Sequence, residues 1–480
     1  MKINKKFKGI ALMLAFIMLF TCVAGCGDDK TGSSSNESSS VTVDASSDAT
    51  VTSQDEASSE DASTTDTSSS TSNTTSTGNT TSTGNTTSTG NNSSKPPVNT
   101  QTSSNAPAAT EPKSINDVID FFVDVPAGRE PVVLQLTDTQ TIDSTTASGK
   151  KIFASDAYYA PSNRQETLYK YIDETIKATK PDLILLTGDL TYGEYDDDGN
   201  CMKDLIEKME SYKIPWAPVY GNHEAETLMG IDWYSEQLEN AKYCLFKQNQ
   251  YYNGKVLTGN GNYTVGIRQG GAVTRVFFMM DSNGYDDFSK IKKKNNHSTG
   301  VIGVQADQMS WYSSQVSYIN KFAPKANISV AFHFQPAVFV TALNERYDLA
   351  NQGKKGSFQI NLDTDSKRNQ KDFGYTNKKP SQPWDKSNSA YNTFKDSGAD
   401  SIFVGHVHRA NLGIYYNDMY LVFGMKTGTH DEYNVLTSDG KLVAGGHPHN
   451  SGETPYVGGT VIKLSTSGEI SNMYNYVCQN

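Results

Sequence analysis

The stretch from about Asp28 to Glu111 consists mainly of Ser, Thr, Asn, Gly and Asp and has almost no large apolar residue. Within it, the sequence Asn-Thr-Thr-Ser-Thr-Gly occurs three times between Asn73 and Gly90. Such a stretch cannot bury enough apolar surface to offset the entropy lost on ordering. We therefore expect 26–113 to be a flexible tether and 114–480 to form one folded domain with a sizeable core.

Residues 1–25 have the organisation of a secretory signal. Four lysines between Lys2 and Lys8 precede an apolar run from Ile10 to Phe20, which is too short for an ordinary membrane-spanning helix. The segment Val23-Ala24-Gly25-Cys26 resembles the lipobox of bacterial lipoproteins, in which cleavage leaves a lipid-modified Cys26 as the new N-terminus. This resemblance implies an extracytoplasmic protein anchored to the cell membrane through Cys26. The alternative is a plain secretory signal with an incidental cysteine.

The remaining cysteines are Cys201, Cys244 and Cys478, once Cys22 is removed and Cys26 is lipidated. An odd number allows at most one disulfide, so no disulfide framework is predicted. None of the three lies within a few residues of another, which excludes a cysteine cluster for structural zinc.

The charge of the chain does not indicate a nucleic-acid partner. The net charge is −11, part of which belongs to the tether. The folded region has no long basic stripe, because the run Lys292-Lys293-Lys294 is short and typical of a solvated loop.

Strand and helix patterns alternate in the folded region. Residues 132–136 form a buried strand pattern, 163–180 a helical pattern that begins with a capping box and ends at Pro181, and 183–186 the next strand. Further short apolar runs cover 276–280, 328–332 and 401–404, and a helix is predicted over 304–318. This alternation is typical of an α/β protein.

Polar side chains follow five of the predicted strands. These segments are Asp138-Thr139-Gln140, Gly188-Asp189, Gly221-Asn222-His223-Glu224 after the extended segment 216–220, His333, and Gly405-His406-Val407-His408. Singly, each has an ordinary explanation as a turn, a helix cap or a structural hydrogen bond. Ligands in open α/β sheets bind at the carboxyl ends of strands, so the five segments together predict a metal site.

The order of these motifs is similar to that of the calcineurin-like metallophosphoesterase superfamily over residues 130 to 410. The resemblance implies an α/β fold with a four-layer α/β/β/α sandwich, in which two mixed sheets pack face to face between helices. It also implies a hydrolase of phosphate mono- or diesters with two metal ions at one edge of the sheets.

The same resemblance assigns roles to residues by motif position. One metal would be held by Asp138, Asp189 and His408, with Gln140 as a further ligand, and the second by Asp189, Asn222, His333 and His406. Asp189 would bridge the two ions, which clamp a phosphate and activate a water as the nucleophile. This mixture of ligands suits manganese, iron or zinc. By analogy His223 would face the phosphate and stabilise or protonate the leaving oxygen, with Glu224 orienting the site.

Gln140 departs from the family pattern, which usually has a histidine ligand at that position. An amide oxygen is a weaker donor than imidazole, so the first metal should bind more weakly or be a different ion. The spacing around Gly188–Tyr192 and Val330–His333 also resembles that of purple acid phosphatases, in which a tyrosine binds ferric iron. Tyr192 would then replace the missing imidazole; the alternative is a core tyrosine.

Three functions remain open from the sequence. The first is a membrane-tethered phosphoesterase. The second is a catalytically weak or inactive binding lipoprotein built on the same fold, for which Gln140 is the support. The third is a structural surface protein whose tether is its main feature.

Two further segments carry weaker expectations. The polar segment 341–395 has little periodicity and is expected to form a substrate rim. In the Gly-rich tail after Gly424, His430, His447 and His449 are expected at the surface, with His430 at the rim of the site.

Overall fold

The computed structural model describes residues 111–142, 165–284, 301–347, 359–366, 368–380, 383–445 and 452–479. Several of the predictions lie outside the described residues: the signal 1–25, Cys26, nearly all of the tether, the helix start at Asn163, the lysine run 292–294, His447 and His449. In the part of the chain that is described, no helix is both long and apolar enough to cross a membrane.

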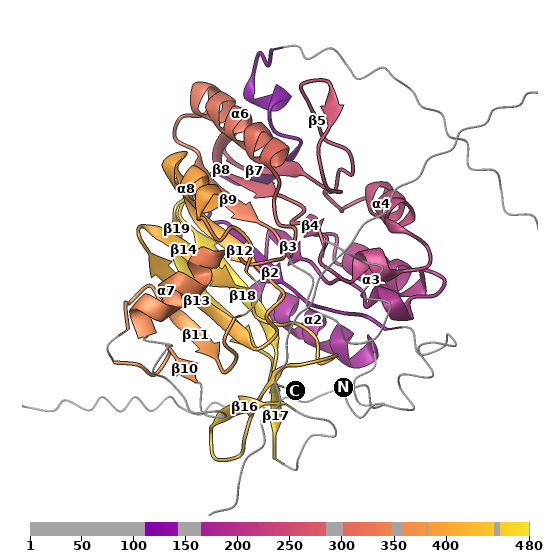
Figure 1. The fold of residues 1–480 in the computed structure, drawn as a ribbon, viewed down its shortest axis with the longest axis vertical. Coiled ribbons are helices and arrows are strands. Elements are labelled where there is room, and N and C mark those ends of the chain that lie inside the picture. The colour runs from indigo at the N-terminus through magenta and orange to yellow at the C-terminus, as the bar shows by residue number, and fades with distance from the viewer. Residues whose placement is uncertain are drawn as a thin grey trace, which may run out of the picture. The chain divides into compact units, whose positions relative to one another are not determined.

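The larger of two central sheets has nine strands and mixes parallel with antiparallel pairs (Figure 1). In spatial order they are β1 (Phe121–Val125), β7 (Tyr263–Gln269), β8 (Ala272–Met279), β9 (Asn327–Ala331), β12 (Ala399–Val404), β14 (Met419–Phe423), β13 (Ala410–Tyr416), β11 (Phe373–Thr376) and β10 (Ile360–Asn361). Strands β8, β9, β12 and β14 run parallel to one another. Their carboxyl ends therefore meet at one edge of the sheet.

The second central sheet has five strands and is also mixed. In spatial order they are β19 (Ile470–Val477), β18 (Gly458–Leu464), β2 (Val132–Leu136), β3 (Leu183–Thr187) and β4 (Trp216–Val219). Strands β2, β3 and β4 are parallel, whereas β18 pairs antiparallel with β2. The C-terminal tail thus supplies two strands of the sheet that also contains β2 and β3.

Two small sheets complete the strand content of the described residues. They comprise β16 (Leu442–Ala444), β15 (Asn434–Leu436) and β17 (Thr454–Tyr456) in one, and β5 (Tyr251–Tyr252) with β6 (Lys255–Val256) in the other.

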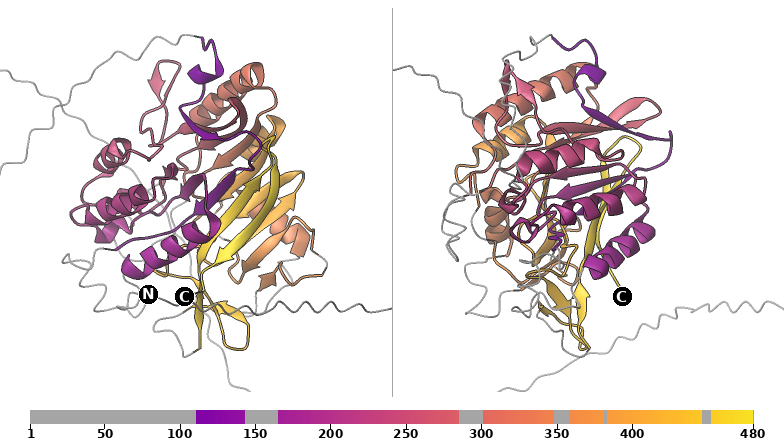
Figure 2. Two further views of the ribbon diagram at one scale, coloured as in Figure 1. Left: turned by 180° about the vertical axis from the view of Figure 1, so that it is seen from behind. Right: turned by 90° about the vertical axis from the view of Figure 1, so that its right-hand side faces the viewer.

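Helices cover the outer faces of the two central sheets (Figure 2). They are α2 (Gln165–Thr179), α3 (Asn200–Ser211) and α4 (Ile231–Asn240) on the side of the five-stranded sheet, and α6 (Ala306–Phe322), α7 (Ala337–Tyr347) and α8 (Ser389–Asp396) on the side of the nine-stranded sheet. The views in Figure 2 show the magenta helices α2 and α3 on the opposite side of the strands from the orange helices.

The alternation of side chains along β8 shows how the core is divided. Val276 and Phe278 pack in one apolar cluster with Trp311 of α6. Phe277 and Met279 point to the other face, into the cluster that also contains Ile184 of β3. Because successive side chains of a strand point to opposite faces, β8 is buried on both sides. The predicted four-layer α/β/β/α arrangement is therefore confirmed.

Most of the predicted elements are confirmed within a few residues. The strand predicted over 132–136 coincides with β2, and those over 183–186, 328–332 and 401–404 correspond to β3, β9 and β12. The three cysteines Cys201, Cys244 and Cys478 are buried and free, in agreement with the absence of a disulfide framework.

One expectation for the later part of the chain was wrong, and one stays a prediction. The described part of 341–395 contains most of α7 together with β10, β11 and α8, and its role as a substrate rim stays a prediction. His430 is buried, with 1% of its surface exposed, and Nδ1 lies 2.7 Å from the carbonyl oxygen of Gln140. Its environment is therefore interior and not a solvated rim.

Candidate metal centre

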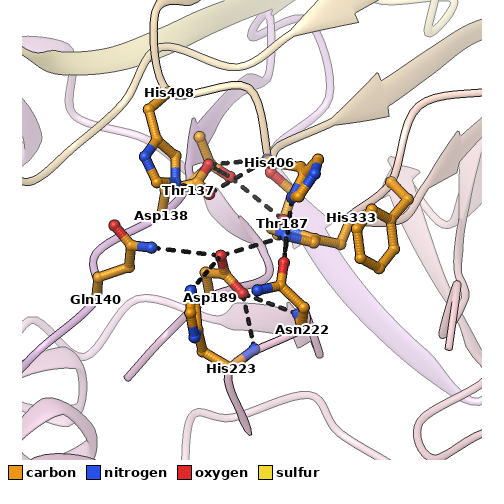
Figure 3. Close-up of polar contacts among 12 residues, drawn as sticks. Thr137, Asp138, Gln140, Thr187, Asp189, Asn222, His223, His333, His406 and His408 are labelled. Carbon is orange, nitrogen blue, oxygen red and sulfur yellow. Dashed lines mark hydrogen bonds and ion pairs between the residues drawn. The ribbon is translucent and has the colours of Figure 1, made fainter. Parts of the chain in front are cut away.

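The five predicted segments converge at one edge of the sandwich, where the two sheets meet (Figure 3). Loops after β2, β3 and β4 carry Asp138, Asp189 and Asn222, and loops after β9 and β12 carry His333 and His406. One sheet therefore supplies the acidic and amide groups, and the other supplies imidazoles. The carboxyl ends of parallel strands make this convergence possible.

The backbone at the centre is held in a conformation that residues other than glycine rarely adopt. Asp138, Gln140, Asp189 and His406 have φ values of 50°, 47°, 51° and 68°. Such left-handed residues persist only where the surrounding structure fixes them, and they concentrate at functional sites. The turns after β2, β3 and β12 are thus fixed by their surroundings.

Two glycines allow the loops to approach closely. A Cβ added at Gly188 would lie 2.4 Å from Nδ1 of His333, and one at Gly221 would lie 2.2 Å from Oδ1 of Asp189. Real Cβ atoms do not approach that closely, so both positions require glycine. Glycine in Gly188-Asp189 and in Gly221-Asn222 is therefore needed for space.

Asp189 occupies the middle of the centre, and its two oxygens have different partners. Oδ1 accepts hydrogen bonds from the backbone N–H groups of Asn222 at 2.9 Å and His223 at 3.1 Å. Oδ2 faces Nε2 of His333 at 3.4 Å and Nε2 of Gln140 at 3.4 Å. One oxygen is thus fixed by the backbone, and the other points into the centre.

The ligand atoms predicted for the second metal lie on the side of β9 and β12. Oδ1 of Asn222 lies 3.2 Å from Nε2 of His333 and 3.1 Å from Nδ1 of His406. Atoms of Asp189, His333 and His406 all lie within 4.8 Å of one another. Nδ1 of His333 is 2.8 Å from the carbonyl oxygen of Thr187 and donates to it, which leaves Nε2 directed at the centre.

The ligand atoms predicted for the first metal, here called the first group, lie on the other side of Asp189. Nε2 of His408 is 3.3 Å from Oδ1 of Asp138, and atoms of Asp138, Asp189 and His408 lie within 4.8 Å of one another. Nδ1 of His408 faces Oδ2 of Asp431 at 3.3 Å. The Asp431 carboxylate therefore orients the ring so that Nε2 points at the centre.

These spacings fit metal coordination. Ligand atoms about 2.1 Å from one ion, at tetrahedral or octahedral angles, lie about 3.0 to 3.4 Å from one another. The distances within the His333 and His408 groups, 3.1 to 3.4 Å, match this range. Asp189 belongs to both groups, so the arrangement suits two ions that share one carboxylate.

Burial and charge determine the protonation of the site. Burial favours the neutral form of Asp189, but His333 and His223 outweigh it and hold its pKa well below the usual value. Burial and the neighbouring His333 lower the pKa of His406 to about 3, so its ring is neutral. Burial opposes the charge of His333, yet Asp189 raises its pKa to about 9. A cation that binds Nε2 of His333 would release that proton.

Gln140 lies in the centre, but its amide oxygen is turned away from it. Oε1 accepts a hydrogen bond of 2.6 Å from Nζ of Lys426, and Nε2 faces Oδ2 of Asp189. Figure 3 shows the amide nitrogen directed toward Asp189 and the oxygen on the opposite side. In this structure Gln140 therefore presents a hydrogen-bond donor to the centre.

His223 contacts groups that the sequence motif did not identify. Its Nδ1 lies 2.6 Å from Oε2 of Glu226, and its Nε2 lies 3.9 Å from Oδ2 of Asp189. The ring of Tyr192 stacks on it with centroids 4.0 Å apart. Burial opposes protonation, but Glu226 and Asp189 raise the pKa of His223 to about 10. Whether Tyr192 also binds a metal stays a prediction.

Glu224 orients the loops of the centre. Its Oε1 accepts from the backbone N–H of Leu190 at 2.5 Å, and its Oε2 from that of Gly221 at 2.6 Å. It is fully buried, and burial together with Asp189 raises its pKa to about 7. The carboxyl group thus joins the loop after β3 to the loop after β4.

The structure brings all seven predicted ligand residues together, and it adds three residues that sequence reasoning missed. These are Glu226, Asp431 and Lys426. Glu226 lies three residues after His223, and this short spacing could have indicated a carboxylate partner. Lys426 is far along the chain from Asp138 and Gln140, and Asp431 lies beyond β13 and β14 from its partner His408, so no local pattern connects them.

The sequence pattern of the calcineurin-like phosphoesterase family matches residues 131–410. The chain belongs to this family. Residues 131–410 are therefore a phosphoesterase domain, as the motifs predicted, and metal ions are the cofactors that the family implies.

Individual relatives are distant. The chain is 27% identical over 171 residues to phosphatase DCR2 of Saccharomyces cerevisiae, covering 35% of this chain and 28% of that protein. It is 23% identical over 194 residues to probable inactive purple acid phosphatase 29 of Arabidopsis thaliana, covering 38% and 46%. The chain thus spans less than half the length of these relatives.

Two solved structures are similar over most of the chain at low identity. A dimetal phosphatase from Danio rerio aligns with a TM-score of 0.34 and 8% identity, covering 68% of this chain and 98% of that chain. Purple acid phosphatase PPD1 from yellow lupin (Lupinus luteus) seeds aligns with a TM-score of 0.33 and 10% identity, covering 72% and 53%.

Proposed function

We propose that the protein is a dinuclear-metal hydrolase of phosphate mono- or diesters, tethered to the outside of the cell membrane. The observation that carries the enzymatic part is the sharing of Asp189 between two groups of ligand atoms. A single ion would need only one such group. When bound, two ions would supply positive charge for a phosphate ester and would lower the pKa of a water molecule that serves as the nucleophile.

The protein side chains have distinct roles in this proposal. Asp138, Asp189 and His408 would hold the first ion, and Asp189 with Asn222, His333 and His406 would hold the second. Manganese, iron and zinc are the candidate ions, because imidazole, carboxylate and amide ligands suit them.

His223 donates a proton to the leaving oxygen. Glu226 favours its charged form, because the two groups are 2.6 Å apart. The stacked ring of Tyr192 limits the orientations of the imidazole. Nε2 of His223 lies near Asp189, so a proton on this atom is close to the ligand atoms at which a phosphate would bind.

The test is hydrolysis of nitrophenyl phosphate and of its bis ester by the purified protein supplied with manganese, iron or zinc. We expect turnover that is lost in Asn222→Ala and His333→Ala while the fold is retained. If these variants hydrolysed the esters as fast as the wild type, the ligand assignment would be contradicted. Metal binding without turnover of either ester would remove the enzymatic proposal.

A binding protein with little or no catalytic activity is the second candidate. The donor orientation of Gln140 favours it, since the family usually has a histidine ligand there. One relative is named a probable inactive phosphatase. Tight binding of inorganic phosphate without ester hydrolysis would favour this candidate over the enzyme.

The location and domain organisation are also part of the proposal. Residues 1–25 act as a lipoprotein signal, Cys26 carries the lipid, 26–113 forms the tether and 114–480 the catalytic domain. The support is the basic and apolar start followed by Val23-Ala24-Gly25-Cys26. In the native host, Cys26→Ala should move the protein from the membrane fraction to a soluble fraction; equal membrane association would contradict the anchor.

A further inference from the structure

Lys426 is a buried lysine that lies directly behind the centre. It follows β14, forms a parallel bridge with Thr137 and has none of its surface exposed. Its Nζ donates to the carbonyl oxygen of Asp138 at 3.1 Å and to Oε1 of Gln140 at 2.6 Å. A buried ammonium requires such partners, because an unpaired charge inside the protein loses its hydration without compensation.

The lysine determines which way the Gln140 amide points. An ammonium group can donate hydrogen bonds but cannot accept them, whereas an amide has one accepting and one donating end. Lys426 therefore selects the orientation in which Oε1 faces Nζ. The NH₂ group of Gln140 is then left to face Oδ2 of Asp189 at 3.4 Å.

An NH₂ group cannot coordinate a cation, because its nitrogen lone pair is delocalised into the amide. It can donate to an anionic oxygen, such as that of a carboxylate or a phosphate. Reversal of the amide would place NH₂ against the ammonium and so lose the 2.6 Å hydrogen bond. The pair thus opposes the use of Gln140 as a ligand.

We infer that Lys426 and Gln140 together convert one ligand position of the first metal group into a hydrogen-bond donor position for the oxygen of Asp189 or of a substrate phosphate. This inference rests on the proposed function and names the residues that set the metal affinity of its first site. The ion of that site is held by Asp138, Asp189 and His408. It binds more weakly than the ion held by Asn222, His333 and His406.

The charge of Lys426 also weakens the binding of a cation at the first group. Burial lowers the pKa of Lys426 from its usual value, although the carboxylates of Asp138, Asp431 and Asp189 oppose this shift. Its hydrogen bond to the backbone of Asp138 places the ammonium next to one ligand of the first group. A positive charge at that distance repels a cation in the same group.

The test is a titration of the metal-free, full-length mature protein with Mn²⁺, with bound metal measured by equilibrium dialysis and elemental analysis. Electron paramagnetic resonance then distinguishes isolated from coupled Mn²⁺. For the wild type we expect one tight ion and a second that binds at least about tenfold more weakly. His408→Ala should lose the weaker ion and His333→Ala the tighter one. Two ions of equal affinity in the wild type would overturn the inference.

Gln140→Leu is the deciding variant. It keeps the size of the side chain and removes both polar ends. If Gln140 is a donor and not a ligand, the affinity for the weaker ion should stay as in the wild type. A loss as large as that of His408→Ala would overturn the inference while leaving the proposed function intact.

Lys426→Met gives a second, independent comparison, with the exposed Lys441→Met as its control. Removal of the ammonium should increase the affinity for the more weakly bound ion by about tenfold, because the repulsion is removed and the amide can turn its oxygen to the metal. The paramagnetic resonance signal of coupled Mn²⁺ should increase as well. Weaker binding in a folded Lys426→Met protein would overturn the inference. Absence of bound Mn²⁺, or unchanged uptake in both His333→Ala and His408→Ala, would overturn the proposed function and this inference together.

Discussion

Nδ1 of His223 lies 2.6 Å from Oε2 of Glu226, three residues further along the chain. The 3-10 helix Glu224–Glu226 begins directly after His223 and brings the two side chains onto one side of the loop. A carboxylate at this distance favours the imidazolium form of the histidine. His223, which by analogy with the family would stabilise or protonate the leaving oxygen, thus has Glu226 as its own charge partner.

Replacement of this partner should change the pH dependence of activity. Glu226 helps to raise the pKa of His223 to about 10, so the ring keeps its proton at neutral pH and loses it as the pH rises. In Glu226→Gln the pKa of His223 should fall, and the alkaline limb of the kcat profile should move by about one to two pH units to lower pH. Glu236→Gln, an exposed glutamate on α4, is the control. Identical profiles for both variants would exclude a role of Glu226 in the protonation of His223.

Asp431 should determine how tightly His408 binds its ion. In Asp431→Asn the ring of His408 loses the charged acceptor at Nδ1, and we expect Mn²⁺ at the first group to bind about tenfold more weakly. Asp418→Asn is a matched control, because Asp418 is exposed and has the same left-handed backbone, with φ of 64° against 59° for Asp431. Equal affinities in a Mn²⁺ titration of the two variants would show that Asp431 does not orient the ligand.

Gly221 should not tolerate a side chain. Its own backbone conformation allows alanine, but the added Cβ would lie 2.2 Å from Oδ1 of Asp189. We expect Gly221→Ala to lose metal binding and to lower the free energy of unfolding by about 1 to 3 kcal/mol. Gly440→Ala has open space around it but a φ of 78°, so only a backbone cost of about 1 kcal/mol is expected there. Urea denaturation and metal analysis of both variants would check this, and normal metal uptake by Gly221→Ala would contradict it.

Asp281 should make stability depend on pH. It is buried after β8, beside a cavity of about 200 Å³, and burial raises its pKa to about 6 although the backbone N–H groups of Asn260 and Asn283 donate to it. Because the folded pKa lies above the unfolded value of 3.8, the stabilising contribution is complete below that value and is lost as the pH rises through about 6. The wild type should therefore lose about 2 to 3 kcal/mol relative to Asp281→Asn between pH 3.5 and 7.5, the range of about four pH units that contains both pKa values. Parallel pH dependence of the unfolding free energies would show that Asp281 does not titrate as described.

Local sequence patterns were sufficient for the elements that carry the centre. The apolar runs at β2 and β3 are buried on both faces, so continuous hydrophobicity marks them without any alternation. The helical periodicity before Pro181 identified α2 for the same local reason. The polar residues that end these strands, such as Asp138 and Asp189, could then be assigned to one edge, because parallel strands end on the same side.

Segments whose partners are distant in sequence were not predictable in this way. Strand β18 contains two glycines and a lysine, and it is recognisable as central only from its pairing with β2. Lysine is mostly exposed in proteins and histidine is intermediate, and the burial of Lys426 and His430 depends on the loop that follows β2. The polar composition of the tail therefore predicted exposed side chains, whereas tertiary packing buries these two.

The sequence by itself determined the family, the layered fold and the seven residues that meet at the centre, because strand patterns and the motifs that follow them are local. Only the tertiary structure decided what those residues contact. The direction of the Gln140 amide depends on Lys426, which is 286 residues away in the chain. An amide has two chemically different ends, and which end faces a metal is fixed by the hydrogen-bond partner that folding brings to the other end.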